Sequence, residues 1–397
     1  MQQVKIKNKN RMVFFLCYMA YCSVYVGRMN LSIASTSMTQ ADMFSTNQIG
    51  MLGSVFSIVY AVGRIINGKI GEKVSPSFMI CIGLAVAGAA NVAFSFMPPF
   101  AAMIVLWGAN AFAQSALWSS FLNVLCAVYD AETAKRKSSL LASSVAIGNV
   151  LGIILNTYIV TYWGFEFAFL VPGIITLLIA GASLYLLFAV KTEANYVDRT
   201  LGAVSVLKDR ELLRIALPAA LHGLIRDNVS FWMTLYFVDT YNVDLEETAI
   251  MILFIPLMGL FGRLIYPFAY KILKGQEHRV SFWCYVLCAV FSVPLIFKLN
   301  AVLAAFCLGM LYALASMINT TMLAIFPLKY SGSGHVPFVS GIMDFMTYFG
   351  ASVSSLVFGF VIEEAGYGAM YACFLPASLL SAALIYSVAF SKRKKQT

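Results

Sequence analysis

Residues 28–32 read RMNLS and residues 226–230 read RDNVS, so the pattern R-x-N-x-S occurs twice with an offset of 198 residues. Two glycine positions repeat at nearly the same offset: Gly63, followed by Arg64, matches Gly262, followed by Arg263, and Gly152 matches Gly350. Three anchors in the same order, at offsets of 198 or 199 residues, are hard to produce by chance. The sequence therefore predicts two halves with the same order of elements.

The composition indicates a protein that lies in a membrane. Hydrophobic residues make up 60% of the 397 residues and charged residues only 11%, whereas soluble proteins carry roughly 25% charged residues. There are too few charges to cover a soluble surface. This excludes soluble enzymes, nucleic-acid-binding proteins and disulfide-framed secreted domains as first interpretations.

Twelve apolar stretches are each long enough to cross a bilayer as a helix, which requires about 20 residues. They are too long and too uniformly apolar for the strands of a membrane barrel. We therefore predict an all-α membrane protein with twelve transmembrane helices. The predicted spans are 12–36, 46–70, 76–97, 99–128, 138–161, 165–190, 212–238, 247–272, 280–298, 300–327, 337–362 and 366–390.

The basic residues predict the orientation of these spans. The two termini and the even-numbered loops carry 22 of the 27 lysines and arginines, whereas the opposite loops carry only Lys298. Cytoplasmic loops are rich in lysine and arginine, so both termini are predicted to be cytoplasmic. The net charge of +9 is then mostly a topology signal. We expect a multi-pass protein of a bacterial inner membrane, bounded by lipid and without a nucleic-acid partner.

The repeat places the first six spans on the last six with the same membrane orientation. Parallel six-helix halves of this kind are typical of the major facilitator architecture. We predict an N-terminal half at 1–190, a cytoplasmic linker at 191–211 and a C-terminal half at 212–397.

Four arginines fall inside predicted spans, where a charged residue costs about 2.5–3.5 kcal/mol at the bilayer centre. Arg28 and Arg226 occupy equivalent positions near the middle of their spans, and a guanidinium matches the geometry of phosphate or carboxylate. We therefore expect a small anionic substrate to be held between them. Asp227 projects about 100° away from Arg226 on a helix, so these two side chains are not expected to pair.

The other two intramembrane arginines lie nearer the cytoplasmic ends of their spans. Arg64 is a candidate for substrate binding or for gating. Arg263 is a candidate for gating, with snorkelling to the interface as the alternative. Asp344 lies at a similar depth in the eleventh span. We predict an Arg64–Asp344 ion pair between the halves that breaks when the cytoplasmic side opens.

Several polar side chains are further candidates for the substrate site. Two tyrosines precede Arg28 on the same helix face, and a polar stripe in the fourth span either lines the site or joins helices. The tyrosines are Tyr21 and Tyr25, and the stripe is Asn110, Gln114 and Trp118.

The three histidines differ in their predicted positions. His222 lies one turn before Arg226 and is either a proton carrier or a structural residue. His278 and His335 are predicted to lie in loops. No spacing typical of a metal site involves them or the eight cysteines, so we expect no metal and no cofactor.

Four motifs together resemble those of one transporter family. They are Tyr21-x3-Tyr25-x2-Arg28-x-Asn30, Asn110-x3-Gln114-x3-Trp118, Arg226-x5-Trp232-x3-Tyr236 and Gly341-x2-Asp344-x3-Tyr348-x-Gly350, in spans 1, 4, 7 and 11. The chain resembles, over its whole length, the organophosphate:phosphate antiporter family of the major facilitator superfamily, which includes glycerol-3-phosphate and hexose-phosphate transporters. Arg64 stands where that family commonly has a lysine.

The resemblance implies that the two arginines bind a phosphate group. It also implies alternating access and exchange of a phosphorylated organic anion against phosphate, by a monomer. Three positions depart from the family pattern. Gly148 replaces a histidine in span 5, Gly223 replaces a tyrosine one turn before Arg226, and Arg263 is an additional charge. These departures leave the identity of the organic anion open.

Two other functions remain open. The sequence Arg28-x-Asn30-Leu31-Ser32-x-Ala34 also resembles the first helix of the anion:cation symporters, which move carboxylates with H⁺ or Na⁺. Those proteins usually carry an arginine in the fourth span, and this chain has none there. A membrane sensor with the same fold is the second alternative. No nucleophile and base present themselves, so an enzyme and catalytic residues are not expected.

Overall fold

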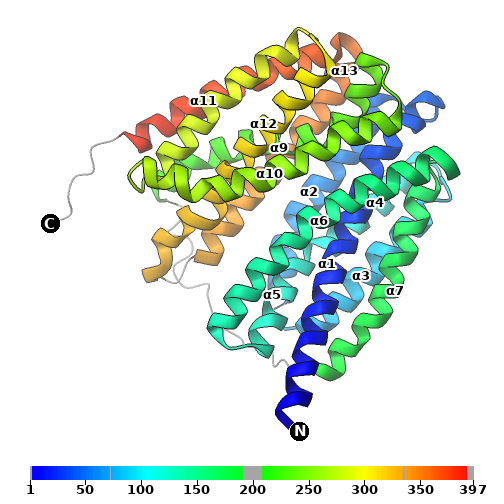
Figure 1. The fold of residues 1–397 in the computed structure, drawn as a ribbon, viewed down its shortest axis with the longest axis vertical. Helices are drawn as coiled ribbons and strands as arrows, with labels where there is room; N and C mark the ends of the chain where they lie inside the picture. Colours follow the sequence, from blue (N-terminus) through cyan, green and yellow to red (C-terminus); the bar gives the residue numbers. More distant parts are fainter. Residues whose placement is uncertain (1, 72, 191–207, 334–335, 391–397) are drawn as a thin grey trace. The chain divides into compact units, whose positions relative to one another are not determined.

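The computed structural model describes residues 2–71, 73–190, 208–333 and 336–390. Regular structure in these ranges is helical throughout (Figure 1). The chain forms two compact units, one of Met1–Met43 with Val55–Val197 and the other of Phe44–Ser54 with Asp198–Thr397. The predicted linker lies mostly at 191–207, outside the described residues, so the predicted boundaries between the halves stay a prediction.

The first unit is a bundle of long helices in which α1 packs against α6 and α7, and α3 packs against α7 (Figure 1). Its apolar core gathers residues of five predicted spans, among them Val13, Leu84, Phe121 and Leu141. The helices are α1 (Gln2–Gln40), α2 (Thr46–Ile70), α3 (Pro76–Phe94), α4 (Phe100–Ser115), α5 (Leu117–Val128), α6 (Ala131–Trp163) and α7 (Phe167–Ala189).

In the second unit α13 packs against α9 and α11, and α10 packs against α12. The first turns of α2 also belong to this unit, where Ser54 and Ser352 of α13 are joined by a 3.0 Å hydrogen bond between their hydroxyls. The elements are α9 (Arg210–Tyr241), α10 (Leu245–Ile272), α11 (Glu277–Ile296), α12 (Ala301–Asn319), η1 (Thr320–Ile325), η2 (Phe326–Ser333) and α13 (Val336–Ala389).

Polar residues at the helix starts explain where several helices begin. The side chains of Ser75, Asp130, Asp209 and Asn300 each accept a hydrogen bond from a backbone N–H in the first turn of the helix that follows. Such caps satisfy backbone donors that have no partner within the helix. The apolar runs therefore set the helix lengths and these residues set their starts.

Ten helices of the described part are long and apolar enough to cross a membrane. One of them, α13, contains both of the last predicted spans, with a kink at Gly366 where φ is 77°. Helix α9 is not among the ten, since its central charged and polar residues lower its hydropathy. The count of twelve spans stays a prediction.

Glycines allow close approach of helices in both units. A Cβ at Gly148 would lie 2.6 Å from the carbonyl oxygen of Cys22 in α1, so a histidine side chain does not fit there as the helices stand. A Cβ at Gly223 would lie 1.8 Å from the carbonyl oxygen of Thr347 in α13. The two glycines that depart from the family pattern are thus explained by helix packing.

Candidate functional site

Arg28 lies half-buried on α1 and contacts the polar stripe of α4. Its Nε donates a hydrogen bond to Oε1 of Gln114 at 3.2 Å. The amide of Gln114 in turn donates to Oδ1 of Asn110 at 2.9 Å. Both α4 residues are buried. Two of the three residues in the predicted stripe therefore form a hydrogen-bonded chain that ends on the arginine.

Aromatic rings surround the same guanidinium. Its carbon lies 4.9 Å from the ring centroid of Tyr25, 4.9 Å from that of Phe56 and 4.8 Å from that of Tyr60. Cations are attracted to the faces of aromatic rings at such distances. The rings come from α1 and α2, so the two helices jointly position Arg28.

A second layer of aromatic residues supports this arrangement. Tyr21 is buried, and its ring lies 5.2 Å from the ring of Tyr25 and 5.2 Å from that of Trp118. The structure thus places Tyr21, Tyr25, Gln114 and Trp118 in one cluster with Arg28. Their contact with a substrate stays a prediction.

Arg64 lies on α2, one turn after Tyr60. Its Nη1 donates to the hydroxyl of Tyr60 at 3.5 Å, and its guanidinium lies 5.9 Å from that ring. Tyr60 therefore connects Arg64 with the ring cluster around Arg28. Asp344 is buried on α13, with 8% of its surface exposed. Arg64 and Asp344 belong to different units, and the ion pair predicted between them stays a prediction.

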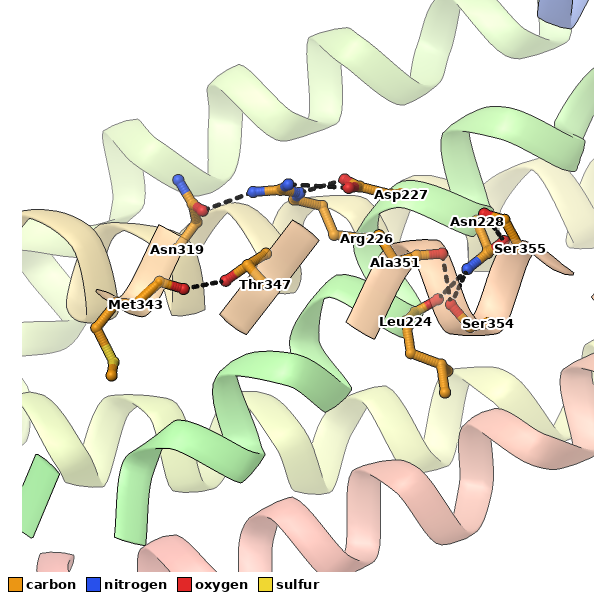
Figure 2. Close-up of polar contacts among 10 residues, drawn as sticks. All are labelled: Leu224, Arg226, Asp227, Asn228, Asn319, Met343, Thr347, Ala351, Ser354 and Ser355. Atoms are coloured by element: carbon orange, nitrogen blue, oxygen red, sulfur yellow. Dashed lines mark hydrogen bonds and ion pairs between the residues drawn. The ribbon is translucent and has the colours of Figure 1, made fainter. Parts of the chain in front are cut away.

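Arg226 on α9 forms a two-bond ion pair with Asp227 (Figure 2). Its Nε lies 2.5 Å from Oδ1 and its Nη2 lies 3.1 Å from Oδ2 of the carboxylate. The expectation that these neighbours do not pair is wrong. The 100° angle applies to the Cα–Cβ directions, whereas the long arginine side chain bends back to the adjacent carboxylate.

A third hydrogen bond fixes the other side of this guanidinium. Nη1 of Arg226 donates to Oδ1 of Asn319 at 2.8 Å (Figure 2). Asn319 is the last residue of α12, and the π-helical segment η1 begins at Thr320. Helical irregularities of this kind are frequent at functional sites. The ring of Tyr348 lies 5.3 Å from the guanidinium.

His222 lies on α9 one turn before Arg226, with 1% of its surface exposed, and it lies beside Asn319. The structure therefore places this predicted site residue next to the Arg226 cluster. Arg263 is placed elsewhere. It is exposed on α10, next to Leu264, which is also exposed. That position fits a guanidinium that extends toward the membrane interface, and its predicted gating role stays a prediction.

The asparagines of the repeated motif join helices. Asn30 donates to Oδ1 of Asn91 on α3 at 2.7 Å. Asn228 donates to Oγ of Ser354 on α13 at 2.7 Å and accepts a bond from Ser355 at 3.0 Å. Two residues along a helix correspond to a rotation of about 200°. The motif thus directs its arginine and its asparagine to nearly opposite faces.

A polar cluster lies at the start of α9 and α11. Nζ of Lys329 lies 2.5 Å from Glu211 and 2.7 Å from Glu277, and Nε2 of His278 lies 2.7 Å from Glu211. The hydrogen bond from His278 and the ion pair with Lys329 lower the pKa of Glu211 to about 2.

The prediction that His278 lies in a loop is wrong. It lies in the first turn of α11, because the helix extends beyond the apolar stretch by one polar turn. His335 falls outside the described residues.

Three residues of the site were not predicted from the sequence. Phe56 and Tyr60 stand eight and four residues before Arg64, so they share its helix face and that spacing was the available signal. Asn319 carried no signal, since the break between α12 and η1 that positions it has no Gly or Pro. Within the described ranges no group of three His, Cys, Asp or Glu side chains is arranged to hold a metal ion.

The chain is similar to a described protein family and to individual membrane proteins. A family model described as Major Facilitator Superfamily matches residues 17–335. A probable hexose phosphate transport protein of Chlamydia trachomatis is 20% identical over an alignment 415 positions long. The alignment covers 93% of this chain and 88% of that protein. The membrane sensor protein UhpC of Salmonella typhimurium is 20% identical over 280 residues, which cover 64% of this chain and 63% of that protein.

Among solved structures, a mutant of the nucleoside transporter NupG matches with a TM-score of 0.79 and 14% sequence identity. The match covers 96% of this chain and 99% of that one. At this identity the likeness concerns the fold alone, and it confirms the predicted all-α membrane architecture.

Proposed function

Because the chain belongs to the Major Facilitator Superfamily, we propose that it is a secondary transporter that exchanges small phosphorylated organic anions for inorganic phosphate. The family makes it a multi-pass membrane protein and a transporter rather than an enzyme. The resemblance to hexose-phosphate transporters that the motifs predicted is confirmed by the relatives found. The exchange against phosphate and the binding residues are our proposal.

One observation carries the proposal: Arg28 lies inside a membrane helix within a ring of aromatic side chains. Since a charged group in a bilayer is expensive, intramembrane ionisable residues are by default functional. A guanidinium binds phosphate through two parallel N–H···O bonds. Rings that hold the guanidinium in place reduce the entropy lost when an anion binds to it.

Arg226 supports the proposal from the repeat-equivalent position. It is held by Asp227 and Asn319, with His222 beside it. We propose that both arginines contribute to binding of the anion, together with Tyr21, Tyr25, Gln114, Trp118 and His222. We further propose that Arg64, Asp344 and Arg263 act in gating, and that both termini face the cytoplasm of a bacterium.

The test is uptake of labelled phosphate into phosphate-loaded proteoliposomes. We expect wild type to exchange phosphate, and Arg28→Gln and Arg226→Gln to lose at least tenfold in rate. Arg214→Gln, a change at an exposed arginine of α9, is the matched control and should leave exchange unchanged. Competition by a panel of organophosphates then identifies the organic anion. Wild-type protein that binds no anion and exchanges none overturns the proposal.

A membrane sensor is the second candidate function, because one of the relatives is the membrane sensor protein UhpC. The two functions differ in turnover. A sensor would bind phosphate or an organophosphate in a direct binding assay, yet it would exchange little in the same vesicles. Carboxylate uptake driven by an imposed pH gradient would instead favour the cation-coupled symporter.

A further inference from the structure

The guanidinium of Arg226 already binds an anionic group of the protein itself, the carboxylate of Asp227. Asp227 takes the Nε and Nη2 donors of the guanidinium, and Asn319 takes Nη1 (Figure 2). The Arg226 side chain is 15% exposed and that of Asp227 is 24% exposed. The carboxylate thus occupies the edge that a phosphate group would occupy in a two-bond complex.

We propose that Asp227 is an internal substitute for the transported anion, which lets the unloaded carrier change its orientation and gives the protein net anion uptake in addition to exchange. The proposal rests on the proposed function, since it concerns the same carrier in its unloaded state.

The physical argument starts from the cost of an uncompensated charge. A carrier that exchanges anions strictly one for one must be unable to reorient while empty. A buried guanidinium without a counter-charge supplies such a block, because desolvating it is costly. In this chain Asp227 neutralises Arg226, with Oδ1 of the carboxylate 2.5 Å from Nε of the guanidinium. The block from this arginine is therefore removed.

The position of Asp227 fits a substitute that withdraws when the anion arrives. It is the direct neighbour of Arg226 on the same helix, so the pair moves as one unit, and breaking it needs only rotations of two side chains. Asn319 holds the guanidinium from the opposite side and keeps it in place during the exchange of partners. The incoming anion competes with Asp227 for Arg226. This competition lowers the apparent affinity of the carrier for the transported anion.

The experiment compares exchange with net uptake in one preparation. Labelled phosphate is offered to vesicles that contain phosphate and to vesicles that contain none, with equal K⁺ on both sides, valinomycin and no pH gradient. We expect wild type to show net uptake at a rate within tenfold of its exchange rate. Asp227→Asn should reduce the ratio of net uptake to exchange at least tenfold and should bind phosphate at least tenfold more tightly.

The ratio of net uptake to exchange does not depend on how much protein is folded, because a loss of active protein lowers both rates equally. Asp227→Glu keeps the charge and should keep net uptake. Asp239→Asn, at the far end of the same helix, is the matched control and should not change the ratio. Wild type that exchanges phosphate without net uptake, or Asp227→Asn with an unchanged ratio, overturns the inference. Wild type that neither exchanges nor binds phosphate overturns the proposed function instead.

Discussion

Asn228 on α9 and Ser354 on α13 are joined by a 2.7 Å hydrogen bond, and the same asparagine accepts bonds from Ser355 and from the indole of Trp232. All of its polar atoms are used, and the residue is fully buried. This network connects the helix that carries Arg226 to its main neighbour in the second unit. The asparagine of the repeated motif therefore serves helix packing, while the arginine is the residue that we propose for anion binding.

The first prediction concerns this network. Asn228→Ala leaves the indole N–H of Trp232 and the hydroxyl of Ser355 without their acceptor, and an unsatisfied buried group costs about 1–3 kcal/mol. We expect a lower melting temperature of the detergent-purified protein. An unchanged melting temperature in the variant would contradict the role of Asn228 in joining the helices.

The second prediction concerns the close approach of α9 and α13. Gly350→Ala places a Cβ 1.9 Å from the carbonyl oxygen of Ala220, so the helices must separate, at a cost of about 1–3 kcal/mol. Gly181→Ala is the matched control on α7, since a Cβ there meets nothing within 4 Å. We expect thermal unfolding to shift down in the first variant only. Equal melting temperatures would mean that the helices adjust without cost.

These two contacts show what sequence patterns can and cannot predict. Apolar runs gave the limits of α2 and α10 to within two residues, because burial in lipid needs a long apolar helix. The repeat marked Arg28 and Arg226 as equivalent. Neither pattern contains the distance between packed backbones, so the close approach of Gly223 to the carbonyl oxygen of Thr347 could not be predicted.

Some of the site residues could be predicted from the sequence and others could not. Arg28 and Tyr25 were predictable as neighbours, since helical spacing places them on one face. Intramembrane polarity marked Gln114 as a residue that either lines the site or joins helices, without naming its partner. The pair of Arg226 with Asp227 was not, because the direction of a Cβ does not limit the reach of a flexible arginine. Partners on distant helices such as Asn319 depend on tertiary packing, which a single sequence does not specify.

The third prediction uses the low pKa of Glu211. A carboxyl whose pKa is lowered on folding stabilises the protein above the unfolded-state value of 4.5, and this contribution is lost as the pH falls toward the folded-state value of about 2. We expect the melting temperature of wild type to fall between pH 5 and pH 3 more steeply than that of Glu211→Gln, as measured by thermal unfolding across this range. Parallel pH profiles would contradict the contribution of Glu211.

The fourth prediction tests the proposed gate. If Arg64 and Asp344 pair during transport, Arg64→Asp and Asp344→Arg each place like charges together and should reduce phosphate exchange at least tenfold. The double variant restores opposite charges and should recover part of the rate. Exchange by all three proteins is measured in phosphate-loaded vesicles. A double variant as inactive as the two single variants would exclude the pairing.

The fifth prediction concerns the rings around Arg28. Phe56→Leu keeps an apolar side chain but removes a face that lies 4.9 Å from the guanidinium, and a cation–π contact contributes about 0.5–2 kcal/mol. We therefore expect phosphate to bind roughly two- to thirtyfold more weakly, because Arg28 is held less firmly in the geometry that receives an anion. The dissociation constant is measured in detergent by titration calorimetry. Phe96→Leu, at a phenylalanine with 77% of its surface exposed, is the matched control and should bind as wild type does. Equal affinity of the two variants would mean that the rings shield Arg28 from lipid without positioning it for the substrate.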